Sequence, residues 1–407
     1  MRSSHGLLLA AAFALGSFSG CDWLQELTRP PEPKKEAVPA KAPAPPERDY
    51  VRPEEQRQMG LRYDPEVFEK GAYRPDELKN MITSPGFDAI AQQTFAEAGG
   101  DFDVDVDRTG ERMIFSTTRY GRNPEIVIQS IKGTAVTLFT GDPASDMMPK
   151  FNPDGTQVVW CSNRYGNWDL LLCPSDRTPN TRPQQLTQST EDEIHPTWSP
   201  DGRMLAFSRY NAMDGLWRIW VLNLENRYLS AITEGLFPEF RPLVEPAAKG
   251  KTTYTLLYQK HRKRDIPWYS VWSIPIVMNA DGAVEVAGPP TEIVANDQWA
   301  AINPCWSPDG EYVAFAAVRK SPVAQWEARI YKADDIWVVR RDGADLTQIT
   351  SHAAPDWGPC WARDPESPAR AGRLYFDSLR NGHENIWSVR PIIAGLVADQ
   401  GAAPQAP

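Results

Sequence analysis

Side chains that commonly carry out catalysis or bind metal ions are sparse in this sequence. Its 407 residues include five histidines and five cysteines. His195 precedes a Pro-Thr-Trp motif, whereas His261, His352 and His383 fall in scattered polar segments. A metal site needs several such ligands together, and no Gly-x-Ser-x-Gly nucleophile motif occurs. We therefore expect no enzyme activity, no metal site and no cofactor.

Arginine, by contrast, recurs in chemically similar surroundings. Tyrosine follows it at Arg119, Arg164 and Arg209, and a basic run extends over Lys260–Arg264. Guanidinium groups and aromatic rings are common in protein–protein interfaces, so these residues could form a docking surface. Alternatively, each arginine pairs with a carboxylate of a neighbouring loop and only stabilises the packing. The formal net charge of −10 argues against nucleic-acid binding, which requires a basic surface.

A repeat of about fifty residues positions these arginines. Its first aromatic residue falls at Phe151, Trp198, Trp306 and Trp361, with Val106 in a weaker first copy. The interval between Trp198 and Trp306 is about twice the usual spacing. It holds a divergent copy that begins at Phe237.

Each copy has the pattern of four short strands joined by tight turns. An apolar stretch ends in Pro-Asp-Gly, an alternating strand follows, and a polar turn leads to a strand such as "RIWVL" or "DIWVV". A short segment such as "QLT" or "QIT" ends the unit. Six such units predict an all-β, six-bladed β-propeller over residues 101–394, in which the repeated aromatic residues pack between blades.

The motif "WSPDG…LAFSRY…IWVLNL…AIT", which begins at Trp198, resembles the TolB-type propeller repeat. The resemblance covers residues 101–394, which are most of the mature chain, and implies a protein-interaction scaffold. TolB also has an α/β domain before its propeller. We expect no full domain of that kind within the residues that precede position 101, so the chain is TolB-like rather than TolB.

The topology of a four-stranded blade places the turn between its second and third strands on one side of the ring, together with the connections between blades. We call this side the loop face. Loops on a rigid scaffold often carry function. The residues expected to interact there are Arg119, Arg164, Arg209, Lys260, His261, Arg262, Lys263, Arg264, Arg319, Lys320, Trp326, Trp357 and Arg380. Blades four and five depart most from the repeat, through the basic run and a long insertion after Arg319.

The N-terminal 58 residues are predicted to lie outside the fold. "MRSSHGLLLAAAFALGSFSGC" resembles a bacterial lipoprotein signal. This resemblance implies that residues 1–20 are removed and that Cys21 is lipidated, which anchors the chain in the bacterial cell envelope, facing the periplasm, at the inner or outer membrane. An ordinary cleaved signal with a free thiol is the alternative. Residues 21–58 are rich in proline and form a disordered tether.

We expect the N-terminal segment 59–100 to close the ring. Its "NMIT", within residues 79–84, resembles the "QLT" strands and is predicted to be the outer strand of blade six. Residues 86–98 are predicted to form a short helix. The alternative closing strand is "PIIAG" from Pro391, and residues 395–407 are expected to be a disordered tail.

Four cysteines lie within the repeats. Cys161 and Cys173 are symmetric about Asn167 in one hairpin, so they could face each other and form a disulfide. Cys305 and Cys360 occupy equivalent positions in adjacent blades. We expect these two to be free buried thiols, although a bridge between them is an open alternative.

Together these features predict a monomeric, lipid-anchored envelope protein without enzyme activity, whose propeller binds another envelope protein. The alternative is a propeller that binds a carbohydrate or small ligand in its channel. His195 is the channel candidate because it begins the inner strand of blade three. The propeller of oligogalacturonate lyase, the comparison for that alternative, uses channel histidines and a metal.

Overall fold

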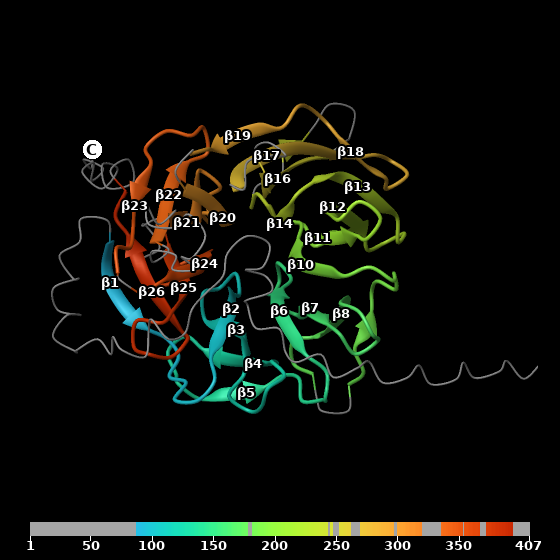
Figure 1. The fold of residues 1–407 in the computed structure, drawn as a ribbon. Helices are drawn as coiled ribbons and strands as arrows, with labels where there is room; N and C mark the ends of the chain where they lie inside the picture. The colour runs from blue at the N-terminus through green and yellow to red at the C-terminus, as the bar shows by residue number, and fades with distance from the viewer. Residues whose placement is uncertain are drawn as a thin grey trace, which may run out of the picture. The chain divides into compact units, whose positions relative to one another are not determined.

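The computed structural model describes residues 87–393, except 178–180, 243–244, 247–251, 262–268, 297–298, 320–334, 353 and 367–371. Every regular element among them is a β-strand, and none of them forms a helix long and apolar enough to cross a bilayer. Six sheets surround a common centre, and the first strand of each lies innermost (Figure 1). The predicted six-bladed propeller is confirmed.

Blades one to three are four-stranded antiparallel sheets whose strands follow the chain from the centre outwards. Blade one contains β2 (Asp101–Val106), β3 (Arg112–Thr117), β4 (Glu125–Ser130) and β5 (Val136–Leu138). Blade two contains β6 (Asp146–Phe151), β7 (Gln157–Ser162), β8 (Asp169–Pro174) and β9 (Gln184–Gln185). Blade three contains β10 (Glu193–Trp198), β11 (Met204–Asn211), β12 (Leu216–Asn223) and β13 (Leu229–Glu234).

Blades four to six vary this plan. Blade four contains β14 (Leu236–Phe240), β15 (Glu245–Pro246), β16 (Thr252–His261), β17 (Tyr269–Met278), β18 (Val284–Val286) and β19 (Thr291–Val294). Blade five contains β20 (Trp299–Trp306), β21 (Tyr312–Arg319), β22 (Asp335–Arg340) and β23 (Thr347–Gln348). Blade six contains β24 (Asp356–Ala362), β25 (Arg373–Ser378), β26 (Asn385–Pro391) and β1 (Phe87–Gln92).

The ring is closed by a strand from the N-terminal side, at different residues from those predicted. β1 pairs antiparallel with β26, with Phe87 opposite Pro391 and Gln92 opposite Trp387. A strand therefore occupies the segment for which we predicted a helix over 86–98. Residues 79–84 lie outside the described part of the chain. The alternative, "PIIAG", does not supply the strand, because Pro391 ends β26.

The helix prediction failed because tertiary pairing outweighed the local preference of an Ala- and Gln-rich segment. Without β1, blade six would have an unpaired edge at β26. β1 supplies hydrogen-bond partners for the backbone N–H and C=O groups of that edge. Thr94 makes the same hydrogen bond as the threonine of the "QLT" strands. Its hydroxyl accepts from the Ile386 amide at 2.9 Å. Thr187 does the same for the Leu170 amide, also at 2.9 Å.

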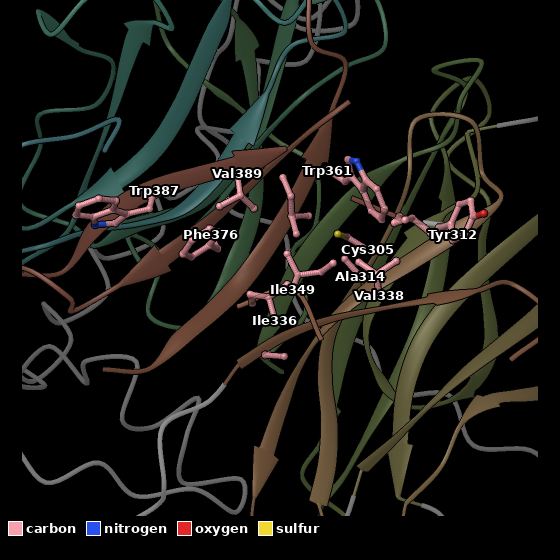
Figure 2. Packing of buried hydrophobic residues seen from close by; sticks show 13 residues of the cluster. Cys305, Tyr312, Ala314, Ile336, Val338, Ile349, Trp361, Phe376, Trp387 and Val389 are labelled. Atoms are coloured by element: carbon pink, nitrogen blue, oxygen red, sulfur yellow. The ribbon is translucent and has the colours of Figure 1, made fainter. Parts of the chain in front are cut away.

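The hydrophobic core is divided among the interfaces between consecutive blades, which we call seams. Each seam holds one cluster of buried residues. Figure 2 shows the cluster between blades five and six, where Cys305, Tyr312 and Val338 meet Phe376 and Trp387. The repeated aromatic positions all contribute, namely Phe151, Trp198, Phe240, Trp306 and Trp361, with Val106 packed at the seam of blades six and one. Each sheet thus buries both faces against its neighbours.

Every innermost strand contains a bulge at the same place. The residue at the bulge has a left-handed backbone in all six blades, with φ between 50° and 57°, at Asp103, Met148, His195, Phe237, Asn303 and Gly358. Such a conformation is costly for residues other than glycine. Side chains of the preceding blade stabilise it, since the Met148 amide donates to Ser116 Oγ at 3.1 Å and the Asn303 amide donates to Gln259 Oε1 at 2.7 Å.

We expect Thr94→Val to lower the free energy of unfolding by about 1–3 kcal/mol, because the buried Ile386 amide loses its acceptor. Chemical denaturation measures the change. Thr137→Val is the matched control, since Thr137 is an exposed threonine on the outer strand β5. Equal stability of the two variants would contradict the role of Thr94 in closing the ring.

Candidate functional site

Arg119 and Arg164 are both bound to carboxylates of their own blades or the adjacent loop. The Arg119 guanidinium forms an ion pair with Asp101, and its Nε lies 2.8 Å from Asp101 Oδ1. Arg164 lies 3.0 Å from Asp146 and 2.8 Å from Asp142. Asp101 and Asp146 are buried at the start of their innermost strands. These arginines are therefore engaged in stabilising the ring.

Arg209 and Arg380 are engaged in the same way. Arg209 lies 2.7 Å from Glu191 and 3.6 Å from Glu193. Arg380 lies 2.6 Å from Asp356, and only 2% of the residue is exposed. We therefore leave Arg380 out of the docking surface, although it was predicted to belong there.

The carboxylate partner occupies one register position, directly before the residue that precedes the bulge. It is present in four blades, as Asp101, Asp146, Glu193 and Asp356. In blades four and five the same position holds Gly235 and Ala301. Neither glycine nor alanine has a side-chain carboxylate. The innermost strands of blades four and five therefore have no carboxylate at this position.

The other predicted interaction residues are only partly within the described chain. Lys260 lies 3.9 Å from Glu234, and the exposed His261 packs on Tyr269 with ring centroids 3.9 Å apart. Trp357 is half-buried against the core of the seam between blades five and six. Outside the described residues lie Arg262, Lys263, Arg264, Lys320 and Trp326, together with the Arg319 side chain and Cys21.

At the end of the ring opposite the loop face, the turns between the first and second strands contact neighbouring blades. Hydrogen bonds between blades run from Arg112 to Gly155 (2.9 Å), from Tyr254 to Asp201 (2.6 Å) and from Arg241 to Gly310 (3.0 Å). At the other three seams a turn glycine packs against the next blade, with Gly202 on Pro153, Gly372 on Pro308 and Gly110 on the Arg363 carbonyl. The turns at this end are thus committed to contacts within the ring.

The turn tips of the loop face are open instead. A Cβ atom added at Gly121, Gly166 or Gly382 would meet no atom within 4 Å among the described residues. Tyr120 and Tyr165, next to two of these glycines, are about half exposed. The loop face therefore combines open turn tips with half-exposed tyrosines, whereas the glycines of the turns at the opposite end contact neighbouring blades.

The channel contains charged residues that the sequence analysis missed. Two residues after each bulge, Asp105, Lys150 and Glu239 come from blades one, two and four. Lys150 lies 3.2 Å from Asp105, and Glu239 accepts from the Trp306 amide at 3.1 Å. The signal in the sequence was the Pro-x-aromatic triplet of blades two to six, whose middle residue occupies this position.

His195 lies at the bulge of blade three and is buried against Phe237, with ring centroids 3.6 Å apart. Burial, followed by the nearby charge of Lys150, lowers the pKa of His195 to about 3. The imidazole is therefore neutral at physiological pH. Among the described residues, no group of three or more His, Cys, Asp or Glu side chains is placed to hold a metal ion.

The predicted disulfide between Cys161 and Cys173 does not form, and both thiols are free. The hairpin of β7 and β8 pairs Cys161 with Leu170 and Val158 with Cys173, so the two cysteines are not opposite each other. The true centre of the hairpin lies closer to Tyr165 than to Asn167. Cys305 and Cys360 are also free.

Several seam and channel carboxyls have raised pKa values because they are buried. Burial raises the pKa of Glu125 to about 7, and the neighbouring Asp146 adds to the rise. Burial and the charge of Glu193 raise the pKa of Asp169 to about 7. Burial, with a smaller contribution from the charge of Asp105, raises the pKa of Glu239 to about 7 against the opposing charge of Lys150. At these three carboxyls the folded ring binds protons more tightly than the unfolded chain does.

These shifts predict that acid stabilises the ring between about pH 8 and about pH 5. A carboxyl whose folded pKa is raised contributes stability below its unfolded pKa, and that stability is lost as pH rises through the folded pKa. We expect the melting temperature to be several degrees higher near pH 6 than near pH 8. Glu239→Gln should weaken this dependence. A melting temperature that rises with pH over this interval would contradict the assignment.

We expect Gly110→Ala to lower the free energy of unfolding by about 1–3 kcal/mol. Gly110 has φ 74°, and a Cβ there would lie 2.6 Å from the Arg363 carbonyl oxygen. Gly121→Ala on the loop face is the control, and it should change stability by less than about 0.5 kcal/mol. Equal losses, measured by urea denaturation, would show that the two ends do not differ as described.

Comparison with known proteins gives low-identity matches. No protein-family model matches the chain. A TolB homologue from Chlorobium luteolum is 24% identical over 260 residues, which cover 62% of this chain and 52% of the relative. An uncharacterised protein from Agrobacterium fabrum is 25% identical over 215 residues, or 52% of this chain and 66% of the relative. The chain spans about half the length of the TolB homologues it matches.

Solved structures of similar proteins include a putative TolB from Agrobacterium tumefaciens. It has a TM-score of 0.47 and 14% identity, over 72% of this chain and 91% of that protein. The six observed sheets, the Trp-Ser-Pro-Asp-Gly repeats and the sequence matches to TolB homologues agree with one another. This chain carries a TolB-like six-bladed β-propeller.

Proposed function

We propose that this protein is a scaffold of the bacterial cell envelope whose loop face binds another protein, without catalysing a reaction. The observation that carries the proposal is the difference between the two ends of the ring. The Asp-Gly turns contact neighbouring blades, whereas a Cβ atom added at Gly121, Gly166 or Gly382 would meet no described atom within 4 Å. The TolB-like propeller supports the same function, because the resemblance implies an interaction scaffold.

Blades four and five supply a basic sector of this surface. Gly235 and Ala301 replace the carboxylates that pair with arginine in the other blades. The Lys260–Arg264 run and Arg319 therefore bring positive charge to a part of the ring where the fold has no matching acid on the innermost strand. Such charge serves recognition and steers association.

The anchor and the location belong to the same proposal. Cys21 would carry the lipid, and the proline-rich residues 21–58 would tether the propeller as a monomer facing the periplasm. The sequence around Cys21 and the similarity to TolB homologues support this placement.

A ligand site in the channel is the weaker alternative. Both ring nitrogens of His195 are buried without a hydrogen-bond partner among the described residues, but the ring is stacked on Phe237 and its neighbour Lys150 is already paired with Asp105. The channel side chains thus satisfy much of one another's charge, and we do not favour a carbohydrate or other small ligand at this position.

Crosslinking in envelope membranes tests the proposal. We expect the wild-type chain to capture a discrete protein, and a chain with Lys260–Arg264 replaced by serine to lose most of it, because the charged recognition sector is gone. A control with Arg340 and Arg341 replaced by serine removes exposed arginines from the opposite end of the ring. Capture of no protein by either chain, or equal loss with the control, would contradict the proposal.

A further inference from the structure

Apolar side chains are exposed on the loop face at the turns of blades two and three. Met213, at the tip of the β11–β12 hairpin, is 96% exposed. Below it, Tyr210 and Trp217 pack together with ring centroids 5.3 Å apart. Tyr165, in the equivalent β7–β8 turn of blade two, is 52% exposed. We call Tyr165, Tyr210, Met213 and Trp217 the blade 2–3 patch.

The patch is held on rigid structure. β11 and β12 pair without interruption from Met204 opposite Asn223 to Asn211 opposite Leu216. At the tip, the Met213 amide donates to Asn211 Oδ1 at 2.9 Å. An ion pair between Asp214 and Arg218 adds a further link. A hairpin whose backbone is fixed before binding loses less conformational entropy on binding than a flexible loop does.

Carboxylates outnumber guanidinium groups around this patch. Arg164 faces Asp142 and Asp146, while Arg209 faces Glu191 and Glu193. Asp192 lies between them, and its side chain accepts from the Trp168 amide at 3.1 Å. The arginines are already engaged, and Asp142, Glu191 and Asp192 retain exposed carboxylate surface.

We infer that the blade 2–3 patch binds a protein segment that combines lysine or arginine with an apolar anchor. The anchor would pack on Met213 and the aromatic rings, and its basic groups would lie beside Asp142, Glu191 and Asp192. The inference rests on the proposed function and adds the location and chemistry of one contact.

The surplus of carboxylates around the blade 2–3 patch favours a basic segment over an acidic segment or an anionic lipid surface. An acidic segment would meet the surplus of carboxylates while the arginines are paired. An anionic lipid surface would be repelled for the same reason. Tyr, Trp and Met are enriched at the centres of protein interfaces, where truncation of a few residues removes most of the affinity.

Two defined peptides test the inference, acetyl-KLWKLWK-amide and the same sequence with glutamate at each lysine. Titration with the full chain should give about tenfold tighter binding of the cationic peptide, and this affinity should fall between about 50 and about 300 mM NaCl. Met213→Ser should weaken binding about fivefold or more. Asp142→Asn combined with Glu191→Gln should reduce the preference for the cationic peptide.

Leu346→Ser is the matched control, because Leu346 is an exposed apolar residue in the β22–β23 turn at the opposite end of the ring. Circular dichroism and melting temperature confirm that each variant is folded. Equal binding of both peptides, or an equal effect of Leu346→Ser, would overturn the inference. If the membrane crosslinking still captures a partner and Met213→Ser leaves it unchanged, the inference fails while the proposed function stands.

Discussion

The pairing of β1 with β26 is the contact on which the rest of the structure depends. Each sheet buries both faces only if the ring is closed, because every seam needs a blade on each side. Blade six draws three strands from the C-terminal side and one from the N-terminal side. The Thr94 hydroxyl and the Asn385 side chain, which accepts from the Ala96 amide at 2.7 Å, fix this last strand. Closure also removes the open edges of an unfinished ring.

Most of the recurrent polar residues make contacts within the ring, so these contacts stabilise the fold and leave the residues less available to a partner protein. The left-handed bulges at Asp103, Met148 and Asn303 are hydrogen-bonded to side chains of the preceding blade. The buried carboxylates Asp101, Asp146, Glu193 and Asp356 bind the recurrent arginines. Function is then expected where the repeat departs from this scheme. In blades four and five, Gly235 and Ala301 occupy the position of this carboxylate. In blade three, the tip of the β11–β12 hairpin exposes Met213.

Periodicity alone predicted the six blades and the aromatic residues of the seams, because the repeat encodes the burial pattern directly. Local patterns failed where partners distant in sequence decide the outcome. β1 is a strand because β26 needs an edge partner, and Cys161 faces Leu170 because the hairpin centre is shifted from the symmetric position. The arginines at 119, 164, 209 and 380 were recognised as a set, yet only the structure separates the buried Arg380 from residues at the surface. Lys150 was missed because the middle residue of the recurrent Pro-x-aromatic triplet differs in type from blade to blade.

Hydrogen–deuterium exchange of the full chain, alone and in its crosslinked complex, would test most directly whether the loop face is the docking surface. Docking there predicts slower exchange in the turns over 118–124, 163–168 and 211–216, with the Asp-Gly turns at Gly155, Gly202 and Gly310 unchanged. Protection confined to the Asp-Gly turns or to the innermost strands around His195 would contradict the assignment of the loop face.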